Sequence, residues 1–354
     1  MDREELGILL ESVGKFMERE IDPHADEIDL YPAKPHPFDL FDRVFQAGLM
    51  RLEDMDDDFL RPANVVKLLI AMSGHCAGVA AFTAYTIAGE IFRRSLGGGD
   101  TSPGVVSIAL FEEADIGVEE CRFDFSTSLE RGVVRGTKRS VMLAPRSDLV
   151  AVFCRAGDKG RIAWVKADSK KVKIGTPVGL IGARALPCAD VDLDGAKALA
   201  VEDLEPGCVA RLLARMGLYT AACACGTAMA ALRAARQYAA ERYQGGKVIE
   251  KHDAVRLLYA KNIAAVESAT AALVAAAEAF EDDGVDSWIR SIRAGAVASE
   301  ASATAAVDAV QVLGGYGYMR DFGLEKRLRD AVALSVLPID GTRASLFCDS
   351  LDRR

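Results

Sequence analysis

The sequence has no long basic run, no CxxC cysteine pair and only four histidines, and each shortage excludes a class of function. Acidic residues outnumber basic ones, with a net charge of −9, so nucleic acid is not expected as a partner. None of the histidines lies at a zinc-ligand spacing from cysteines or carboxylates, so we expect no metal site. An anionic ligand would need a local basic pocket.

The sequence also lacks the pattern of an export signal. Residues 1–21 carry charges throughout and have no uninterrupted apolar core. The eight scattered cysteines then fit reduced thiols in a cytoplasmic protein. The longest uncharged stretch, 216–232, is mostly Ala, Gly, Thr and Cys, which is too short and too weakly apolar for a membrane span. We expect a buried helix there and no membrane partner.

Half of the 354 residues are apolar, which is enough for two or three packed units. Helical spacing of apolar residues continues to about residue 96, short β-type runs such as CRFDFSTS (121–128) follow, and an Ala-rich helical pattern starts near 205. The expected fold is α+β. It comprises an N-terminal helical domain (1–98), a middle antiparallel β-barrel-like domain (99–204) and a C-terminal helical bundle (205–354), with bundle helices at about 208–243, 248–282, 286–312, 321–335 and 342–352.

Three motifs suggest chemistry but have the wrong context. GHCAG at 74–78 has the spacing of a nucleophile elbow, yet a helical run precedes it, so its glycines are expected to allow close packing. Cys223 and Cys225 are two apart in a helix and point to different faces, so we expect them to be packing residues. No strand precedes the glycines at 314–317, which argues against a Rossmann loop.

Four other segments carry a family resemblance. QVLGGYGY (311–318) and GLEKRLRDA (323–331) resemble the QxxGGxGY and EKxxRDA signatures of the acyl-CoA dehydrogenase family at the right separation. ERYQGG (241–246) is similar to the family's ERxxFG, and IDGT (339–342) occupies the position of its YEGT. The likeness covers nearly the whole chain and implies the same three-part fold.

The resemblance implies FAD as the cofactor. Gln311, Gly314 and Gly315 would contact the FAD of a neighbouring subunit, and Arg242 with Gln244 would hold its adenosine diphosphate part. A Gly-Gly pair suits this role because backbone without Cβ atoms can approach a flat cofactor. The alternative is that Gly314 is a helix C-cap and Arg242 a surface charge.

Asp340 is the candidate catalytic base, because the matching Glu of the family removes the substrate α-proton while the β-hydride leaves for the flavin. Aspartate is shorter by about one 1.5 Å bond, so the backbone or the substrate must move to compensate. By the same resemblance Thr342 would touch the flavin, and Gly341 is a candidate substrate contact. The alternative is that Asp340 only caps the last helix.

The segments that cover the flavin in the family differ here. Phe111-Glu112-Glu113 replaces its TEP, and Ser140-Val141-Met142 replaces its WIT, so the stacking Trp and the hydroxyl near the flavin are missing. Ser140 and Met142 remain the candidate flavin contacts. Arg215 and Arg184 are the candidate substrate-binding residues, with a solvated surface charge as the alternative for each.

The resemblance therefore implies an FAD-dependent acyl-CoA dehydrogenase. Such an enzyme would oxidise an acyl-CoA thioester to an enoyl-CoA, pass the electrons to an electron-transferring flavoprotein and assemble as a homotetramer. Two alternatives stay open. One is non-oxidative acyl-CoA chemistry, suggested by the altered flavin-contact segments. The other is a non-catalytic subunit that pairs with an active homologue and contributes only the Gln311–Gly315 edge.

Overall fold

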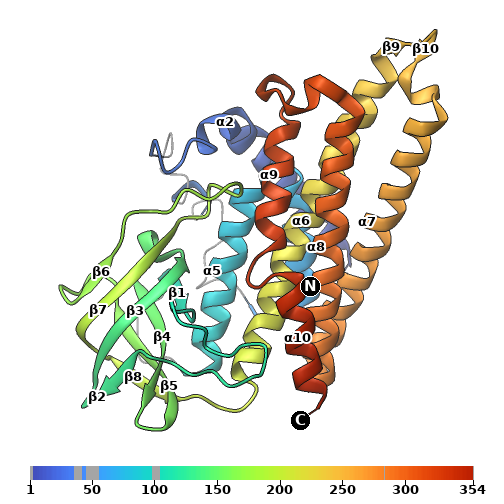
Figure 1. The fold of residues 1–354 in the computed structure, drawn as a ribbon. Coiled ribbons are helices and arrows are strands. Elements are labelled where there is room, and N and C mark those ends of the chain that lie inside the picture. Colours follow the sequence, from blue (N-terminus) through green and yellow to red (C-terminus); the bar gives the residue numbers. More distant parts are fainter. Residues whose placement is uncertain (1–2, 36–41, 45–55, 98–103, 283, 354) are drawn as a thin grey trace.

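The first part of the chain is helical, as expected. The computed structural model describes residues 3–35, 42–44, 56–97, 104–282 and 284–353 (Figure 1). The expected domain boundary at residues 98 and 99 falls within 98–103, outside the described residues. The described helices before that point are α1 (Arg3–Phe16), α2 (Ala25–Ile28), α4 (Pro62–Ser73) and α5 (Ala77–Ser95).

The middle part forms an eight-stranded sheet in the order β6-β7-β3-β2-β4-β5-β8, with β1 beside β4. Most neighbouring strands are antiparallel as expected, but β1 and β2 each run parallel to β4. The strands are β1 (Val106–Ala109), β2 (Ser128–Glu130), β3 (Val133–Met142), β4 (Leu149–Ala156), β5 (Lys159–Lys166), β6 (Val172–Ile174), β7 (Cys188–Lys197) and β8 (Ala200–Asp203).

One expected strand is wrong. The alternating run 121–128 forms irregular backbone up to its last residue, where β2 begins. Cys121 and Phe123 have φ angles of 56° and 59°, which fold the segment into turns that a pleated strand does not allow. This loop reaches from the sheet to the helical bundle.

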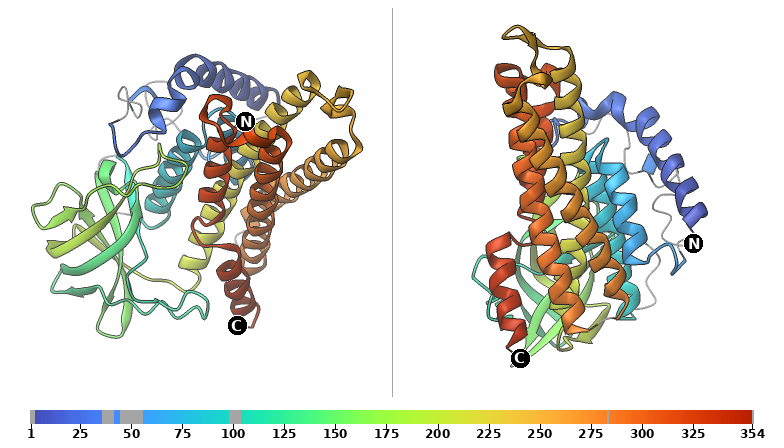
Figure 2. Two further views of the ribbon diagram at one scale, coloured as in Figure 1. Left: turned by 45° about the horizontal axis from the view of Figure 1, so that its top comes forward. Right: turned by 90° about the vertical axis from the view of Figure 1, so that its right-hand side faces the viewer.

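The last part is a helical bundle that stands beside the sheet, as Figure 2 shows from two further sides. Its helices lie in the expected ranges, but two of them begin later, at 253 where about 248 was expected and at 324 where about 321 was expected. Residues 243–248 form a small hairpin (β9, Tyr243–Gln244; β10, Lys247–Val248) around Gly245 and Gly246, both with positive φ. The bundle comprises α6 (Cys208–Glu241), α7 (Asp253–Ala279), α8 (Val285–Leu313), α9 (Leu324–Ser335) and α10 (Gly341–Asp352).

Helix α6 is the core of the bundle, and α7 is more exposed. Cys223 and Cys225 are completely buried in α6, which confirms their packing role. By length and composition alone both helices could span a membrane, but 78% of the apolar window in α6 is buried, as in a core helix. Only 33% of the window in α7 is buried, so this helix keeps an open face that is rich in alanine.

Glycine at selected positions of α6 allows the backbone of a neighbouring helix to approach closely. A Cβ on Gly226 would lie 2.2 Å from the carbonyl oxygen of Ile70 in α4, whereas a Cβ on Gly217 would meet no atom within 4 Å. Gly226→Ala should therefore lower the free energy of unfolding by about 3 kcal/mol through overpacking. Gly217→Ala in the same helix should be neutral or stabilising by up to about 1 kcal/mol. Urea denaturation of both variants checks this, and equal stabilities would contradict the packing.

The 74–78 motif is a packing site and not a nucleophile elbow. Cys76 is 1% exposed and precedes the first turn of α5, and burial raises the pKa of its thiol. A Cβ on Gly78 would lie 2.6 Å from the backbone nitrogen of Ala185, so glycine lets α5 approach the sheet domain. The expected close packing is present, although the partner is a loop of the sheet domain.

The GLEKRLRDA segment joins the three parts of the chain. Asp330 in α9 is buried and accepts hydrogen bonds from the backbone of Ala183 at 2.7 Å and from Lys326 Nζ at 2.8 Å. Arg329 pairs with Asp29 of the N-terminal part, with Nη2 2.6 Å from Oδ2. Helix α9 therefore fixes both the sheet domain and the N-terminal helices against the bundle.

Candidate functional site

The candidate residues fall into two groups at different ends of the bundle (Figure 1). Asp340, Gly341 and Thr342 lie at the start of α10, where Gly341 and Gly295 of α8 line the same small cavity. Gln311 lies about 24 Å further along α8 from that point, at 1.5 Å per residue. The structure does not bring the two groups together within one chain.

In the turn after α8, part of the backbone is exposed. Gly314 ends the helix with φ 57° and ψ −131°, a conformation that suits glycine, so the C-cap alternative is observed. A Cβ on Gly315 would meet nothing within 4 Å, whereas one on Gly317 would lie 2.3 Å from the oxygen of Val310. The chain's own packing therefore requires Gly317 but leaves the backbone at Gly315 accessible to a ligand from outside.

A cationic side chain lies beside this turn. Arg242 follows the last residue of α6 and is exposed, with its guanidinium carbon 5.9 Å from the ring centre of Tyr316. Among the described residues it forms no ion pair, so its charge is available to an anionic group. Gln244 is exposed in the neighbouring hairpin, and its backbone oxygen lies 2.9 Å from Nε2 of His252.

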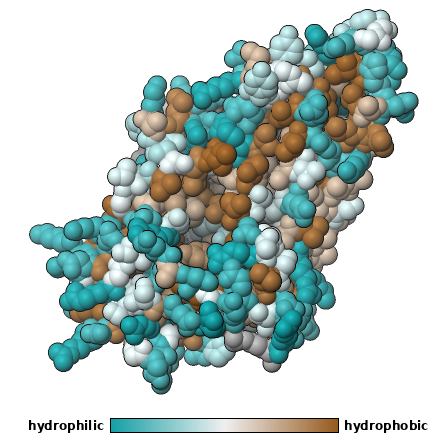
Figure 3. All heavy atoms as spheres, in the orientation of Figure 1, coloured by the Kyte–Doolittle hydropathy of each residue, from teal (hydrophilic) through white to brown (hydrophobic). Residues whose placement is uncertain are grey.

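Aromatic residues cluster at the same end of the bundle. The ring of Tyr316 lies 5.1 Å from that of Phe322 and 6.4 Å from that of Tyr238. Tyr318 is 73% exposed. Figure 3 shows apolar side chains gathered over the helices of this face, while the sheet domain is largely hydrophilic. The sequence analysis missed this cluster, although the aromatic density of GGYGYMRDF was a usable signal.

Asp340 is the N-cap of α10. Its Oδ1 accepts hydrogen bonds from the backbone nitrogens of Thr342 at 2.9 Å and Arg343 at 3.1 Å. Among the described residues, no hydrogen bond reaches its Oδ2. The side chain is half-buried, whereas Gly341 and Thr342 are exposed. The capping alternative is therefore observed, and one carboxylate oxygen is still free for another role.

An ion pair attaches the first turn of α10 to the sheet domain. Arg343 binds the carboxylate of Glu119 in the loop before β2, and its Nη2 lies 3.8 Å from Asp115. The hydrogen bond from Arg343 lowers the pKa of Glu119. Phe123 of this loop also packs edge-on against Phe347 of α10, with 6.3 Å between the ring centres. The loop thus fixes the helix that carries Asp340.

Ser140 lies in a bulge of β3, and Met142 follows it. The register between β3 and β7 shifts after Lys138, and Ser140 adopts a φ of 50°, which is uncommon for a residue with a side chain. Its backbone nitrogen donates to Asp190 Oδ1 at 2.9 Å. Ser140 is exposed and Met142 is half-buried, so the strand presents a polar, bulged edge where the family has Trp.

A buried ion pair lies just before this bulge. Lys138 Nζ is 2.7 Å from Glu112 Oε1, and both side chains are at most 2% exposed. Burial raises the pKa of Glu112, but hydrogen bonds from Lys138, Ser126 and Thr127 outweigh it and lower the pKa to about 2. Burial lowers the pKa of Lys138 to about 8, against the attraction of Glu112. The pair fixes the 111–113 segment to β3.

Neither candidate arginine lies beside Asp340. Arg184 donates to the backbone oxygens of Leu180 at 2.9 Å and Asp29 at 2.8 Å, so it connects the sheet domain to the N-terminal part. Arg215 lies over the ring of Phe280 at 4.8 Å and lines a cavity between α5 and α6. The cavity that contains Gly341 lies instead against Gly217 of α6, which is on a different face of that helix from Arg215.

A groove of about 660 Å³ separates the sheet domain from the bundle. The 121–125 loop and the turn between β4 and β5 form one side, and the start of α6 with Phe347 and Leu351 of α10 forms the other. Three cationic side chains, Arg122, Arg155 and Lys159, and three acidic ones, Asp124, Asp158 and Glu205, line it together with aromatic rings. The groove therefore combines charged groups of both signs with flat apolar surface next to the helix that Asp340 caps.

The chain has clear relatives among known proteins. Residues 209–345 match the family model "Acyl-CoA dehydrogenase, C-terminal domain". Benzylmalonyl-CoA dehydrogenase of Aromatoleum aromaticum is 28% identical over 343 residues, which are 90% of each chain. The chain belongs to the acyl-CoA dehydrogenase family. It is an oxidoreductase of this family, as the resemblance in the 241–246, 311–331 and 339–342 segments implies.

Solved structures of the same fold support this family fold over the whole chain. Butyryl-CoA dehydrogenase from Megasphaera elsdenii superposes with a TM-score of 0.88 at 18% identity and full coverage of both chains. A glutaryl-coenzyme A dehydrogenase in complex with glutaryl-CoA gives a TM-score of 0.84 at 19% identity, covering 100% of this chain and 96% of that one. The expected three-part α+β fold is confirmed.

Proposed function

We propose that this acyl-CoA dehydrogenase family member oxidises a CoA thioester to the enoyl-CoA with FAD as its cofactor. The observation that carries the proposal is the open Gly314–Gly315 turn beside the exposed Arg242. A Cβ at Gly315 would meet no atom of the described residues within 4 Å, which fits backbone that contacts a bound ligand. FAD, when bound, accepts the hydride that leaves the substrate β-carbon.

The turn and its neighbours fit the dinucleotide part of FAD. The guanidinium of Arg242 would pair with the pyrophosphate, and the amide of Gln311 would hydrogen-bond the adenosine part. Because Gln311 lies about 24 Å along α8 from Gly295, which lines the cavity at the start of α10, this turn would serve the cofactor of a neighbouring subunit. The altered 111–113 and 140–142 segments form the flavin-facing side of the sheet in this proposal.

The groove between sheet and bundle would take the CoA arm. Arg155 and Lys159 supply positive charge for its phosphates, whereas Arg122 pairs with Asp124, with 3.2 Å between Nε and Oδ2. Phe347 lines this groove and lies two turns along α10 from Asp340, so the groove is continuous with the side of α10 that carries both residues. The thioester would then reach the start of α10.

Asp340 would act as the base through Oδ2. Its Oδ1 is occupied by two backbone N–H groups, which hold the side chain in one orientation, while Oδ2 takes the proton from the carbon next to the thioester carbonyl. The Arg343 to Glu119 pair and the Phe123 to Phe347 contact hold α10 in place. The shorter side chain requires the substrate to approach the helix terminus closely.

The variant Asp340→Asn tests the proposed catalytic role of Asp340 while keeping its role as a helix cap. Asparagine caps helices as well as aspartate does, so the free energy of unfolding should change little, but the base is removed. The expected result is retained flavin with loss of flavin bleaching when an acyl-CoA substrate is added anaerobically. Asp340→Ala should in addition cost about 1 kcal/mol of stability. Undiminished bleaching in Asp340→Asn would remove Asp340 from the mechanism.

One observation favours a second candidate function. The cavity at the start of α10 includes Gly341 but not Asp340, and its volume is only about 20 Å³. A non-catalytic subunit that gives its Gly314–Gly315 edge to the flavin of an active homologue would need no substrate space there. Such a subunit would be colourless when purified alone and would raise flavin content only when co-purified with that homologue.

The assembly and the electron acceptor are part of the same proposal. The alanine-rich open face of α7 and the exposed aromatic cluster around Tyr316 supply apolar surface for other subunits. A tetramer would place one subunit's Gly314–Gly315 turn against the next subunit's cofactor. Electrons would leave to an electron-transferring flavoprotein. Analytical ultracentrifugation tests the assembly, since a monomer that retains FAD would contradict a shared cofactor site.

A further inference from the structure

The turn between α9 and α10 determines where Asp340 lies. Helix α9 ends at Ser335 and α10 begins at Gly341, so residues 336–340 connect the two helices and Asp340 is the last of them. Beyond this point α10 is attached to the sheet domain through Arg343 and Phe347. The turn itself has a separate contact, which comes from α6.

Thr220 of α6 reaches this turn with its hydroxyl. The side chain is 1% exposed, and its Oγ1 lies 2.8 Å from the carbonyl oxygen of Leu337, which is 117 positions later in the chain. The carbonyl oxygens of Met216 and Gly217 lie 2.9 Å and 3.3 Å from the same Oγ1. Because a hydroxyl has one proton, it can donate fully to only one of the three oxygens.

The three carbonyl groups differ in their other donors. Those of Met216 and Gly217 lie inside α6, where each accepts the backbone N–H four residues further on. The carbonyl of Leu337 follows the end of α9, and no backbone N–H of the described residues donates to it. A half-buried carbonyl without a donor is unfavourable. The Thr220 proton is therefore assigned to Leu337, and this hydrogen bond holds the turn on α6.

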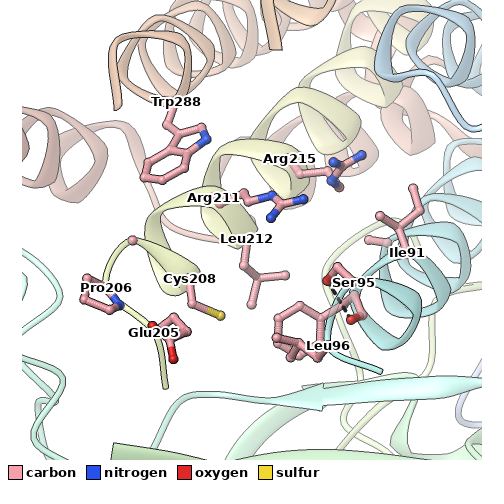
Figure 4. A pocket seen from close by; sticks show the side chains of 13 residues that line it. Ile91, Ser95, Leu96, Glu205, Pro206, Cys208, Arg211, Leu212, Arg215 and Trp288 are labelled. Carbon is pink, nitrogen blue, oxygen red and sulfur yellow. Dashed lines mark hydrogen bonds between the residues drawn. The ribbon is translucent and has the colours of Figure 1, made fainter. Parts of the chain in front are cut away.

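The contact lies apart from the two larger spaces at the start of α6. Figure 4 shows Arg215 of α6 at the cavity between α5 and α6. Thr220 comes five positions later, which is about 140° around the helix. It lines neither this cavity nor the groove assigned to the CoA arm. Removal of its hydroxyl should therefore affect the turn before Asp340 and leave the residues that line those spaces unchanged.

We propose that Thr220 is a positioning residue for the reaction. Its hydroxyl holds the 336–340 turn on α6 and so sets the distance between the Asp340 carboxylate and the substrate α-carbon. The inference rests on the proposed function, in which Asp340 removes the α-proton. The short aspartate side chain has little reach to compensate for a shift of the turn, and a displacement of about 1 Å can lower a rate about a hundredfold.

The test is stopped-flow measurement of flavin bleaching in the full-length, FAD-loaded protein. The probes are 3-phenylpropanoyl-CoA, cyclohexane-1-carbonyl-CoA and 2-methylpropanoyl-CoA, and the one that bleaches the wild type fastest is used for the variants. Thr220→Val keeps the shape of the side chain and removes the hydroxyl. We expect its rate at saturating thioester to fall at least about tenfold, with the half-saturating concentration within about twofold of the wild type and unchanged FAD content.

Two further variants separate the hydroxyl from the packing of the side chain. Thr220→Ser keeps the hydroxyl and should regain most of the wild-type rate, whereas Thr220→Ala should be as slow as Thr220→Val. Because the serine and alanine variants differ from each other only in the hydroxyl, they give the same test if Thr220→Val does not fold.

Thr227→Val is the matched control. Thr227 lies two turns further along α6 and is also 1% exposed, but its nearest acceptor is the carbonyl oxygen of Cys223 in the same helix, at 2.8 Å. This variant should bleach at the wild-type rate. Urea denaturation of both valine variants shows whether any difference in rate follows from stability.

Three results would overturn the role of Thr220 alone. They are equal bleaching rates in Thr220→Val and Thr227→Val, a slow rate that Thr220→Ser does not restore, and slowing that comes with lost FAD or a raised half-saturating concentration. A wild-type protein that no thioester bleaches, or undiminished bleaching in Asp340→Asn, would overturn the proposed function or its base together with this inference.

Discussion

Gly315→Val is expected to give a folded protein that has lost at least about nine-tenths of its FAD, an affinity loss of about 1.4 kcal/mol or more. The reason is steric, because a valine side chain would occupy the space through which the cofactor reaches the backbone at the end of α8. A Cβ at this position meets no atom of the described part of the chain within 4 Å, so the fold should not change. The ratio of flavin absorbance to protein absorbance measures the effect.

The matched control is Gly7→Val in α1, where a Cβ also meets nothing within 4 Å. Its flavin content should equal that of the wild type. Arg242→Ala should lower flavin occupancy as well, because it removes the cation beside the turn. Full flavin occupancy in both Gly315→Val and Arg242→Ala would show that this end of the bundle is not part of the cofactor site.

Lys138→Met should lower the free energy of unfolding by about 3–5 kcal/mol, because it leaves the buried carboxylate of Glu112 without its cation. The double variant Glu112→Gln, Lys138→Met should lose less, since neither member then carries an uncompensated charge. Arg135→Met on the same strand is the control. Its pair with Asp194 is exposed, with 3.9 Å between Nη1 and Oδ1, and should contribute less than about 1 kcal/mol.

Chemical denaturation across a pH series adds a second readout for Lys138. The pKa of Glu112 is lowered to about 2 in the folded protein, so its stabilising contribution is full above its unfolded pKa near 4.5 and is lost as the pH falls toward 2. Lys138→Met should reduce this loss of stability in acid. An unchanged acid profile, with unchanged stability at neutral pH, would contradict the buried pair.

The sequence predicts the helices better than the loops that shape the site. Long periodic runs such as α6 and α8 agree with the expected ranges, because period and composition both favour a helix. The 121–128 segment alternates like a strand but follows left-handed turns at Cys121 and Phe123, and nothing in its pattern indicates them. The hairpin at 243–248 depends on two glycines that also fit a helix end.

The motifs give positions in the chain but not the contacts between distant segments. Asp340 and Gly315 could be identified from short patterns, and the capping role of Asp340 was one of two alternatives. The pair between Arg343 and Glu119 joins residues that are 224 positions apart, so local spacing carries no signal for it. The positions of Arg184 and Arg215, away from Asp340, depend in the same way on the tertiary packing of α6 and α9.

The most direct test of the central claim is an anaerobic titration of the purified protein with acyl-CoA thioesters carrying aromatic, alicyclic and short branched chains. The account predicts a yellow protein whose visible flavin band bleaches with at least one of these thioesters, together with formation of the enoyl-CoA. A folded protein that carries FAD and keeps its flavin band unchanged with every thioester would contradict it.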